Sequence, residues 1–199
     1  MKWICILIIV STAAYACVSP AEMQQTWSNP EQQKDSTKLF QKILFVAFVK
    51  DAAARRIAED KLVHEVKGRG VASYSYLGNE NVNEDKSLLS ERLKRDGFDG
   101  IVVMRMITIN KTGVNTPGTF PSYYNSWYGY YSSTSPAFND PSYATSNIYN
   151  IETNVYSLAE DKLLWSGVTS AVNISDTHKM VDKVIASVKE RMKSEGFIK

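Results

Sequence analysis

Apolar residues in this chain form uninterrupted runs in some places and a helical period in others. Residues 43–49 (ILFVAFV) lack any polar side chain, which predicts a strand covered on both faces and central in a sheet. From Asp51, a helix-capping residue, the spacing changes to four through Ala54, Ala58, Leu62 and Val66. This spacing predicts the first helix, which ends before Gly68 and Gly70.

The next three segments follow the same scheme. Residues 71–77 alternate serine with larger side chains, which predicts a strand with one buried face. Residues 87–96 align Leu89 with Leu93, and Gly97 followed by Phe98 is typical of a helix end. Residues 101–109 (IVVMRMITI) predict another strand.

The carboxyl-terminal part predicts a hairpin and a helix. Residues 149–158 and 163–174 are strand-like and flank a short polar break, so we expect them to pair antiparallel. Asp176 suits a helix start, and the helix after it places five apolar residues on one face: Val181, Val184, Ile185, Val188 and Met192.

The order of elements predicts the fold class. It is β-α-β-α-β, an insertion, then β-β-α, which indicates an α/β (α+β) fold with one mixed sheet of about five strands and helices packed on it. At 199 residues the chain has the length of one domain with appendages, and we expect that single domain to span residues 39–199.

The amino terminus has the layout of a secretory signal peptide over residues 1–16. Lys2 supplies positive charge, residues 3–10 (WICILIIV) are apolar, and small residues follow. The run is too short for a membrane-spanning helix, which needs about 20 apolar residues. The alternative is a buried first helix of the domain.

Two kinds of cleavage fit this leader. Ala14 and Ala16 satisfy the small-x-small rule of ordinary signal peptidase, which would release a soluble periplasmic or secreted protein. The same stretch followed by Cys17 resembles a bacterial lipobox, although Ala14 stands where leucine is usual. We favour lipidation of Cys17, because a lone exposed thiol on an exported protein is reactive. Residues 17–38 then become the lipidated end and a flexible tether without a fold of its own.

Residues 111–148 form an insertion rich in Tyr, Gly, Ser, Pro and Asn, without a helix or strand period. Aromatic side chains among small flexible residues are typical of binding loops. The aromatic residues expected to contact a partner are Tyr123, Tyr124, Trp127, Tyr128, Tyr130 and Tyr131. The alternative is a surface excursion whose aromatics pack on their own domain or on lipid headgroups.

Charge and residue counts exclude several classes of function. The formal net charge is only +2, which builds no strong field for nucleic acid. With His64 and His178 as the two histidines, we expect no metal site and no histidine triad. No motif indicates a cofactor.

Carboxylates leave one catalytic alternative open. A pair of them can hydrolyse glycosides, and six are available, but we expect all six at helix surfaces or turns: Glu59, Asp60, Asp96, Asp99, Glu160 and Asp161.

The leader, Cys17, the aromatic insertion and the hairpin phrase NIETNVYSLAEDKLLWSG together resemble uncharacterised bacterial envelope lipoproteins. The order of elements also resembles, more loosely, the small α/β domain of the curli secretion lipoprotein, of penicillin-binding-protein activator lipoproteins and of the TolB amino-terminal domain. This resemblance covers residues 39–198 by pattern alone and transfers no site residue.

The resemblance implies a non-catalytic lipoprotein at the periplasmic face of the outer membrane. We expect it to bind or help assemble another envelope protein through a sheet edge or the aromatic insertion. The alternatives are a secreted hydrolase using carboxylates and a periplasmic small-ligand binder.

Overall fold

In a computed structural model, the protein is described over residues 21–31, 40–49, 51–78, 86–107, 122–134, 148–172 and 176–198. Six strands form one sheet in the order β1-β6-β5-β4-β2-β3. The strands are β1 (Ala21–Ser28), β2 (Ile43–Phe48), β3 (Gly70–Ala72), β4 (Gly100–Ile107), β5 (Ile148–Ser157) and β6 (Lys162–Val172). The helices are α1 (Ala52–Glu65), α2 (Ser73–Tyr76), α3 (Lys86–Arg95), η3 (Ser122–Asn125), α4 (Trp127–Thr134) and α5 (Thr177–Ser194).

The sheet is mixed, which confirms the predicted fold class. Strand β2 runs parallel to β3 and β4, whereas the pairs β4–β5, β5–β6 and β1–β6 are antiparallel. The predicted hairpin over residues 149–174 is therefore present. Among the described residues the sheet has six strands rather than about five, because β1 adds an edge that the sequence did not predict.

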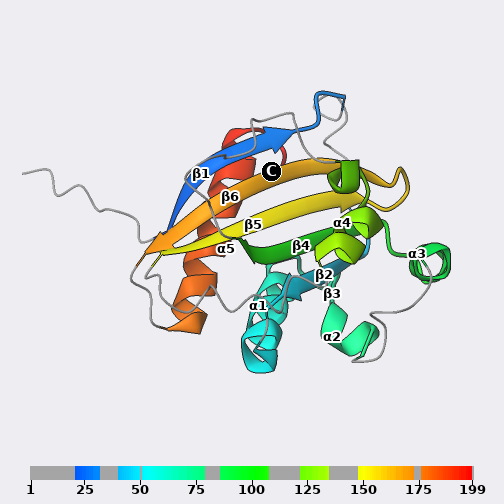
Figure 1. Cartoon of the computed structure of the whole chain (residues 1–199), viewed down its shortest axis with the longest axis horizontal. Helices are drawn as coiled ribbons and strands as arrows, with labels where there is room; N and C mark the ends of the chain where they lie inside the picture. Colours follow the sequence, from blue (N-terminus) through cyan, green and yellow to red (C-terminus); the bar gives the residue numbers. More distant parts are fainter. Residues whose placement is uncertain are drawn as a thin grey trace, which may run out of the picture.

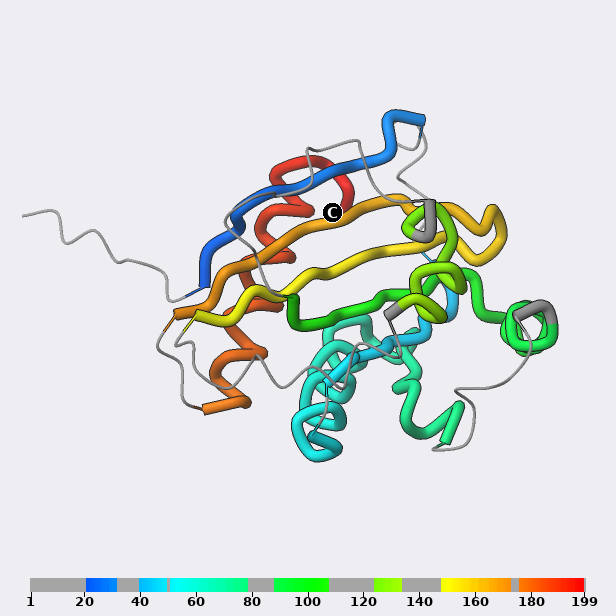
Figure 2. The backbone as a smooth tube through the Cα atoms, in the orientation of Figure 1, coloured from blue at the N-terminus to red at the C-terminus, as the bar shows by residue number. Residues whose placement is uncertain are grey.

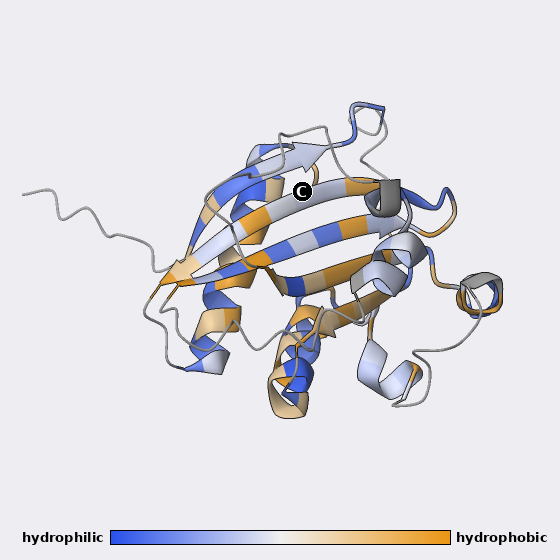
Figure 3. Cartoon of the chain, in the orientation of Figure 1, coloured by the Kyte–Doolittle hydropathy of each residue, from blue (hydrophilic) through white to orange (hydrophobic). Residues whose placement is uncertain are grey.

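Helices cover both faces of the sheet (Figure 1). On one face α1 and α5 pack over a core that includes Phe45, Val155 and Trp165. On the opposite face the core joins Leu89 and Leu93 of α3 to aromatic residues of η3 and α4. Every residue of β2 is buried, as the apolar run 43–49 predicted. In Figure 3 the apolar colour accordingly dominates β2 and β4.

Predicted helix ends are confirmed by their hydrogen bonds. Asp51 caps α1 by accepting from the Ala54 amide at 2.7 Å, and Asp176 caps α5 by accepting from the Lys179 amide. Gly97 follows α3 with a φ of 82°, a left-handed conformation that glycine adopts without strain. The five apolar residues predicted for one face of α5 are all buried.

The prediction of an unstructured tether over residues 17–38 is wrong for residues 21–28. These residues form β1, which pairs antiparallel with β6 from Ala21↔Ala171 to Ser28↔Trp165. The register shifts between Met23 and Gln25, so a bulge sends Met23 to the α5 side and Trp27 to the other core. The sheet of the folded domain therefore includes residues 21–28, which precede the predicted domain start at residue 39.

The predicted strand over residues 71–77 is also wrong beyond Ala72. Glu59 of α1 accepts hydrogen bonds from the backbone amides of Ala47 at 3.0 Å and Tyr74 at 2.9 Å. Because both amides donate to Glu59, they are not available to extend the backbone hydrogen bonds between β2 and β3. The chain turns instead into the short helix α2, closed by the Leu77 amide donating to the Ser73 carbonyl.

Candidate functional site

Two charged residues stand opposite each other in the middle of the sheet, beneath the insertion. Arg105 of β4 and Glu152 of β5 are register partners, and Arg105 Nε donates to Glu152 Oε2 at 2.8 Å. The side chain of Glu152 is 5% exposed and that of Arg105 18%. A buried ion pair needs further hydrogen bonds to offset the cost of removing two charges from water.

The insertion supplies those hydrogen bonds. Tyr124 of η3 donates to Glu152 Oε1 at 2.8 Å and accepts from Arg105 Nη2 at 3.0 Å. The Tyr130 hydroxyl of α4 donates to Glu152 Oε2, and the Arg105 guanidinium lies 4.9 Å from the centre of the Tyr130 ring. The carboxylate of Glu152 therefore fixes both η3 and α4 of the insertion to the sheet.

The pKa of Tyr130 fits this role. Burial raises the pKa of Tyr130 well above its usual value, and the adjacent Glu152 carboxylate raises it further. Tyr130 therefore keeps its proton throughout the physiological range and remains a donor to Glu152.

The predicted partner contacts in the insertion need correction. Tyr124, Trp127, Tyr130 and Tyr131 are buried, and Trp127 and Tyr130 have no exposed surface. Tyr128 is half-buried and packs edge-on against Trp127, and the side chain of Tyr123 lies outside the described residues. The four buried aromatics pack on their own domain, because apolar rings gain more from the core than from water. The rest of the predicted insertion, residues 111–121 and 135–147, lies outside the described residues.

Sequence reasoning missed the Arg105–Glu152 pair. The sequence indicates this pair only through one charged residue in each of two predicted strands, Arg105 in IVVMRMITI and Glu152 in NIETNVY. Lone charges inside predicted strands are rarely buried without a partner, so the two runs could have been matched to each other.

Next to this pair, Asn154 of β5 is fully buried, and neither its Oδ1 nor its Nδ2 atom has a hydrogen-bond partner within the part of the chain that the structure describes. Tyr156, two residues further along β5, likewise has an unpartnered hydroxyl there. Burial is the largest cause that raises the pKa of Tyr156 above its usual value. Buried polar atoms without a hydrogen-bond partner lower the stability of the fold, because they lose their hydrogen bonds to water.

The prediction that six carboxylates lie at surfaces or turns is wrong for Glu59. Its side chain is fully buried and accepts from Arg55 Nε at 3.0 Å and Ser73 Oγ at 2.7 Å, in addition to the amides of Ala47 and Tyr74. Glu59 thus works as a structural junction between α1, β2 and α2.

The other carboxylates serve local contacts. Asp60 accepts from the Tyr74 hydroxyl at 2.6 Å, and Asp99 accepts from the Lys42 amide at 3.0 Å. Asp96 accepts from the Tyr76 hydroxyl; burial and this bond raise the pKa of Tyr76 to about 12. Glu160 and Asp161 lie in the turn between β5 and β6.

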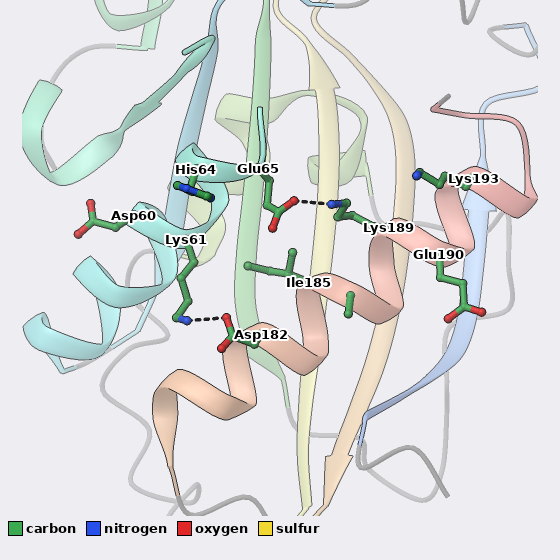
Figure 4. Close-up of a pocket in the computed structure, with 10 residues that line it drawn as sticks. Asp60, Lys61, His64, Glu65, Asp182, Ile185, Lys189, Glu190 and Lys193 are labelled. Carbon is green, nitrogen blue, oxygen red and sulfur yellow. Dashed lines mark hydrogen bonds and ion pairs between the residues drawn. The ribbon is translucent and has the colours of Figure 1, made fainter. Parts of the chain in front are cut away.

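A groove of about 780 Å³ runs between α1 and α5 (Figure 4). Ion pairs cross it from Lys61 to Asp182 and from Lys189 to Glu65. Charges of both signs therefore join the two helices. His64 lines this groove, but among the described residues no three His, Cys, Asp or Glu side chains are grouped to hold a metal ion.

The predicted anchor, Cys17, precedes strand β1 closely in the sequence. Cys17, Ala14 and Ala16 are outside the described residues, and Ala21 begins β1 only four positions after Cys17. Four residues reach at most about 14 Å when fully extended. None of the helices that the structure describes is long and apolar enough to cross a membrane.

The fold and these contacts define an α+β domain with a mixed sheet. No protein-family profile and no curated protein sequence matches the chain. Among solved structures, the PelC dodecamer from Paraburkholderia phytofirmans is similar at 9% identity and a TM-score of 0.42, over 84% of this chain and 96% of that one. Lipoprotein GNA1162 from Neisseria meningitidis is similar at 11% identity and a TM-score of 0.37, over 77% of this chain and 98% of that one.

Proposed function

We propose that the protein is a non-catalytic lipoprotein of the bacterial envelope, which is anchored through Cys17 at the periplasmic face of the outer membrane and binds another envelope component through its sheet edge. The observation that carries this proposal is the position of β1. This edge strand starts four positions after Cys17, so an acylated cysteine would hold the first residue of the edge within about 14 Å of the membrane.

Strand β1 has the properties of a docking edge. It is eight residues long, whereas β3 at the other edge has three. Within the described ranges no strand pairs with the outer side of β1, and Glu22 and Gln24 are exposed there. Edge strands offer backbone donors and acceptors to a partner strand.

The use of the buried charges supports a binding role rather than catalysis. Glu59 accepts from four donors and Glu152 from three. A general acid or base has to meet a substrate proton, and both carboxylates are enclosed by the domain's own donors.

The anchor is tested with globomycin, which blocks the lipoprotein signal peptidase, and with the variant Cys17→Ser. We expect the untreated protein to sediment with outer membranes in a density gradient. Globomycin should lead to accumulation of an uncleaved precursor, and C17S should leave the outer-membrane fraction. A soluble native protein that is insensitive to globomycin would overturn the proposal.

The docking edge is tested by placing a photo-reactive benzoylphenylalanine at Gln24 in living cells. The matched control places it at Lys94, an exposed residue of α3 away from the edge. We expect an adduct with another envelope component from position 24 and not from position 94. The same adducts from both positions, or none from position 24, would contradict docking at β1.

A further inference from the structure

Exposed aliphatic side chains gather at one end of the sheet. Among the described residues the large apolar side chains with high exposure are Leu88, Ile148 at 49% and Val172 at 40%. Ile148 begins β5 and Val172 ends β6, and the two are direct register partners. Leu88 lies on α3, outside the sheet.

The same end of the sheet receives the chain from its amino terminus. Ala171, the neighbour of Val172, pairs with Tyr149 on one side and with Ala21 on the other. The start of β1 therefore lies beside the Ile148–Val172 pair, as Figure 2 shows where the blue, yellow and orange tubes converge. In Figure 3 the ends of β5 and β6 carry the apolar colour.

We propose that the sheet end formed by Ala21, Ile148 and Val172 lies against the lipid bilayer. This inference rests on the proposed lipid anchor. Once Cys17 carries its lipid, Ala21 can lie at most about 14 Å from the membrane, which brings the two exposed aliphatic side chains next to Ala21 within reach of the lipid interface.

The contact would orient the domain rather than provide its affinity, which the acyl chains supply. Strand β6 has 11 residues, and at about 3.3 Å each it spans roughly 35 Å. The turn at the opposite end of the β5–β6 hairpin, with exposed Ala159 and Glu160, would project away from the membrane. The β1 edge would then run outward from the bilayer and face the periplasm along its length.

The chain offers a clean labelling experiment. Its two cysteines are Cys5, in the predicted leader, and Cys17, whose thiol would be converted to a thioether when the diacylglyceryl group is attached. Val172→Cys therefore gives the full acylated protein one reactive thiol, and Ala159→Cys is the matched control at the other end of the hairpin. Each is labelled with the fluorophore NBD and reconstituted into phosphatidylethanolamine and phosphatidylglycerol vesicles that contain a lipid with a nitroxide on acyl carbon 5.

We expect the nitroxide to quench the label at position 172 about twofold and to leave the label at position 159 nearly unchanged, since only the former sits within the interface. Ile148→Cys provides a second probe of the same end if V172C folds poorly, as judged by circular dichroism. Equal quenching at both ends of the hairpin would overturn the inference.

Two failures can be told apart by the mass of the reconstituted protein. If Cys17 carries no lipid, the anchor itself is refuted. If Cys17 is acylated and positions 148 and 172 both remain unquenched, the anchor stands and the bilayer contact is wrong.

Discussion

Glu152 shows how one buried carboxylate can organise a segment that carries no periodic pattern. Arg105 neutralises it from the neighbouring strand, and Tyr124 and Tyr130 reach it from the insertion. The aromatic residues are therefore fixed by polar bonds to one site as well as by packing. This explains why side chains that seemed suited to a partner lie in the core.

Replacing Glu152 tests this interpretation. In Glu152→Ala, Arg105 would stay buried without its partner, so we expect the free energy of unfolding to fall by about 3 to 5 kcal/mol. Urea denaturation followed by tryptophan fluorescence measures the change. Glu160→Ala, in the exposed turn, is the control and should change stability by less than about 0.5 kcal/mol. An equally small effect of E152A would contradict the role assigned to Glu152.

For a substitution of Asn154 we predict the opposite effect, a gain in stability. Its amide is buried and unpartnered within the described chain, so Asn154→Leu removes an unmet polar group while keeping the volume similar. We expect the free energy of unfolding to rise by about 1 kcal/mol, because an unsatisfied buried group costs roughly 1 to 3 kcal/mol. A clear loss of stability in the same urea titration would show that the amide has a structural partner.

At the scale of elements, caps and periodicity predict α1, α3 and α5, whereas hydrogen bonds that the Glu59 side chain accepts from the backbone end the strand predicted over residues 71–77. Helices α1, α3 and α5 follow from local residues such as Asp51, Gly97 and Asp176. The end of β3 depends on Glu59, which is distant in sequence. The bulge between Met23 and Gln25 hides β1, because it removes the period of two by which strands are recognised.

Strand β1 is joined to α5 by Glu195, which accepts from the Thr26 hydroxyl and from Trp165 Nε1 at 2.8 Å. Partial burial raises the pKa of Glu195, but hydrogen bonds from Thr26 and Trp165 outweigh this effect, and the pKa lies below its usual 4.5.

A carboxylate with a lowered pKa in the folded state stabilises the fold above its unfolded pKa, and this stabilisation is lost as the pH falls through the folded pKa. Glu195→Gln should therefore be less stable than the wild type at pH 7, with a difference that shrinks below about pH 4.5. Urea titrations of both proteins across this range measure the difference. A difference that stays constant with pH would mean that the charge of Glu195 contributes nothing.

At the scale of the whole molecule, the sequence predicted the fold class and the hairpin, while the site could be predicted only in part. The pairing of Arg105 with Glu152 needs the register of β4 against β5, which local patterns do not contain. The short distance in sequence between the predicted leader and an edge strand likewise becomes apparent only when residues 21–28 are known to form β1. With β1 in place, the start of the proposed docking edge lies beside the exposed Ile148–Val172 pair and follows Cys17, the proposed lipid anchor, by four positions in the sequence.

The intact mass of the mature protein from native membranes tests the central claim most directly. We expect a chain that begins at Cys17, lacks residues 1–16 and carries the added mass of a diacylglyceryl group and an amide-linked acyl chain. A mature chain that retains Met1, or that begins at residue 17 with a free thiol, would contradict the account.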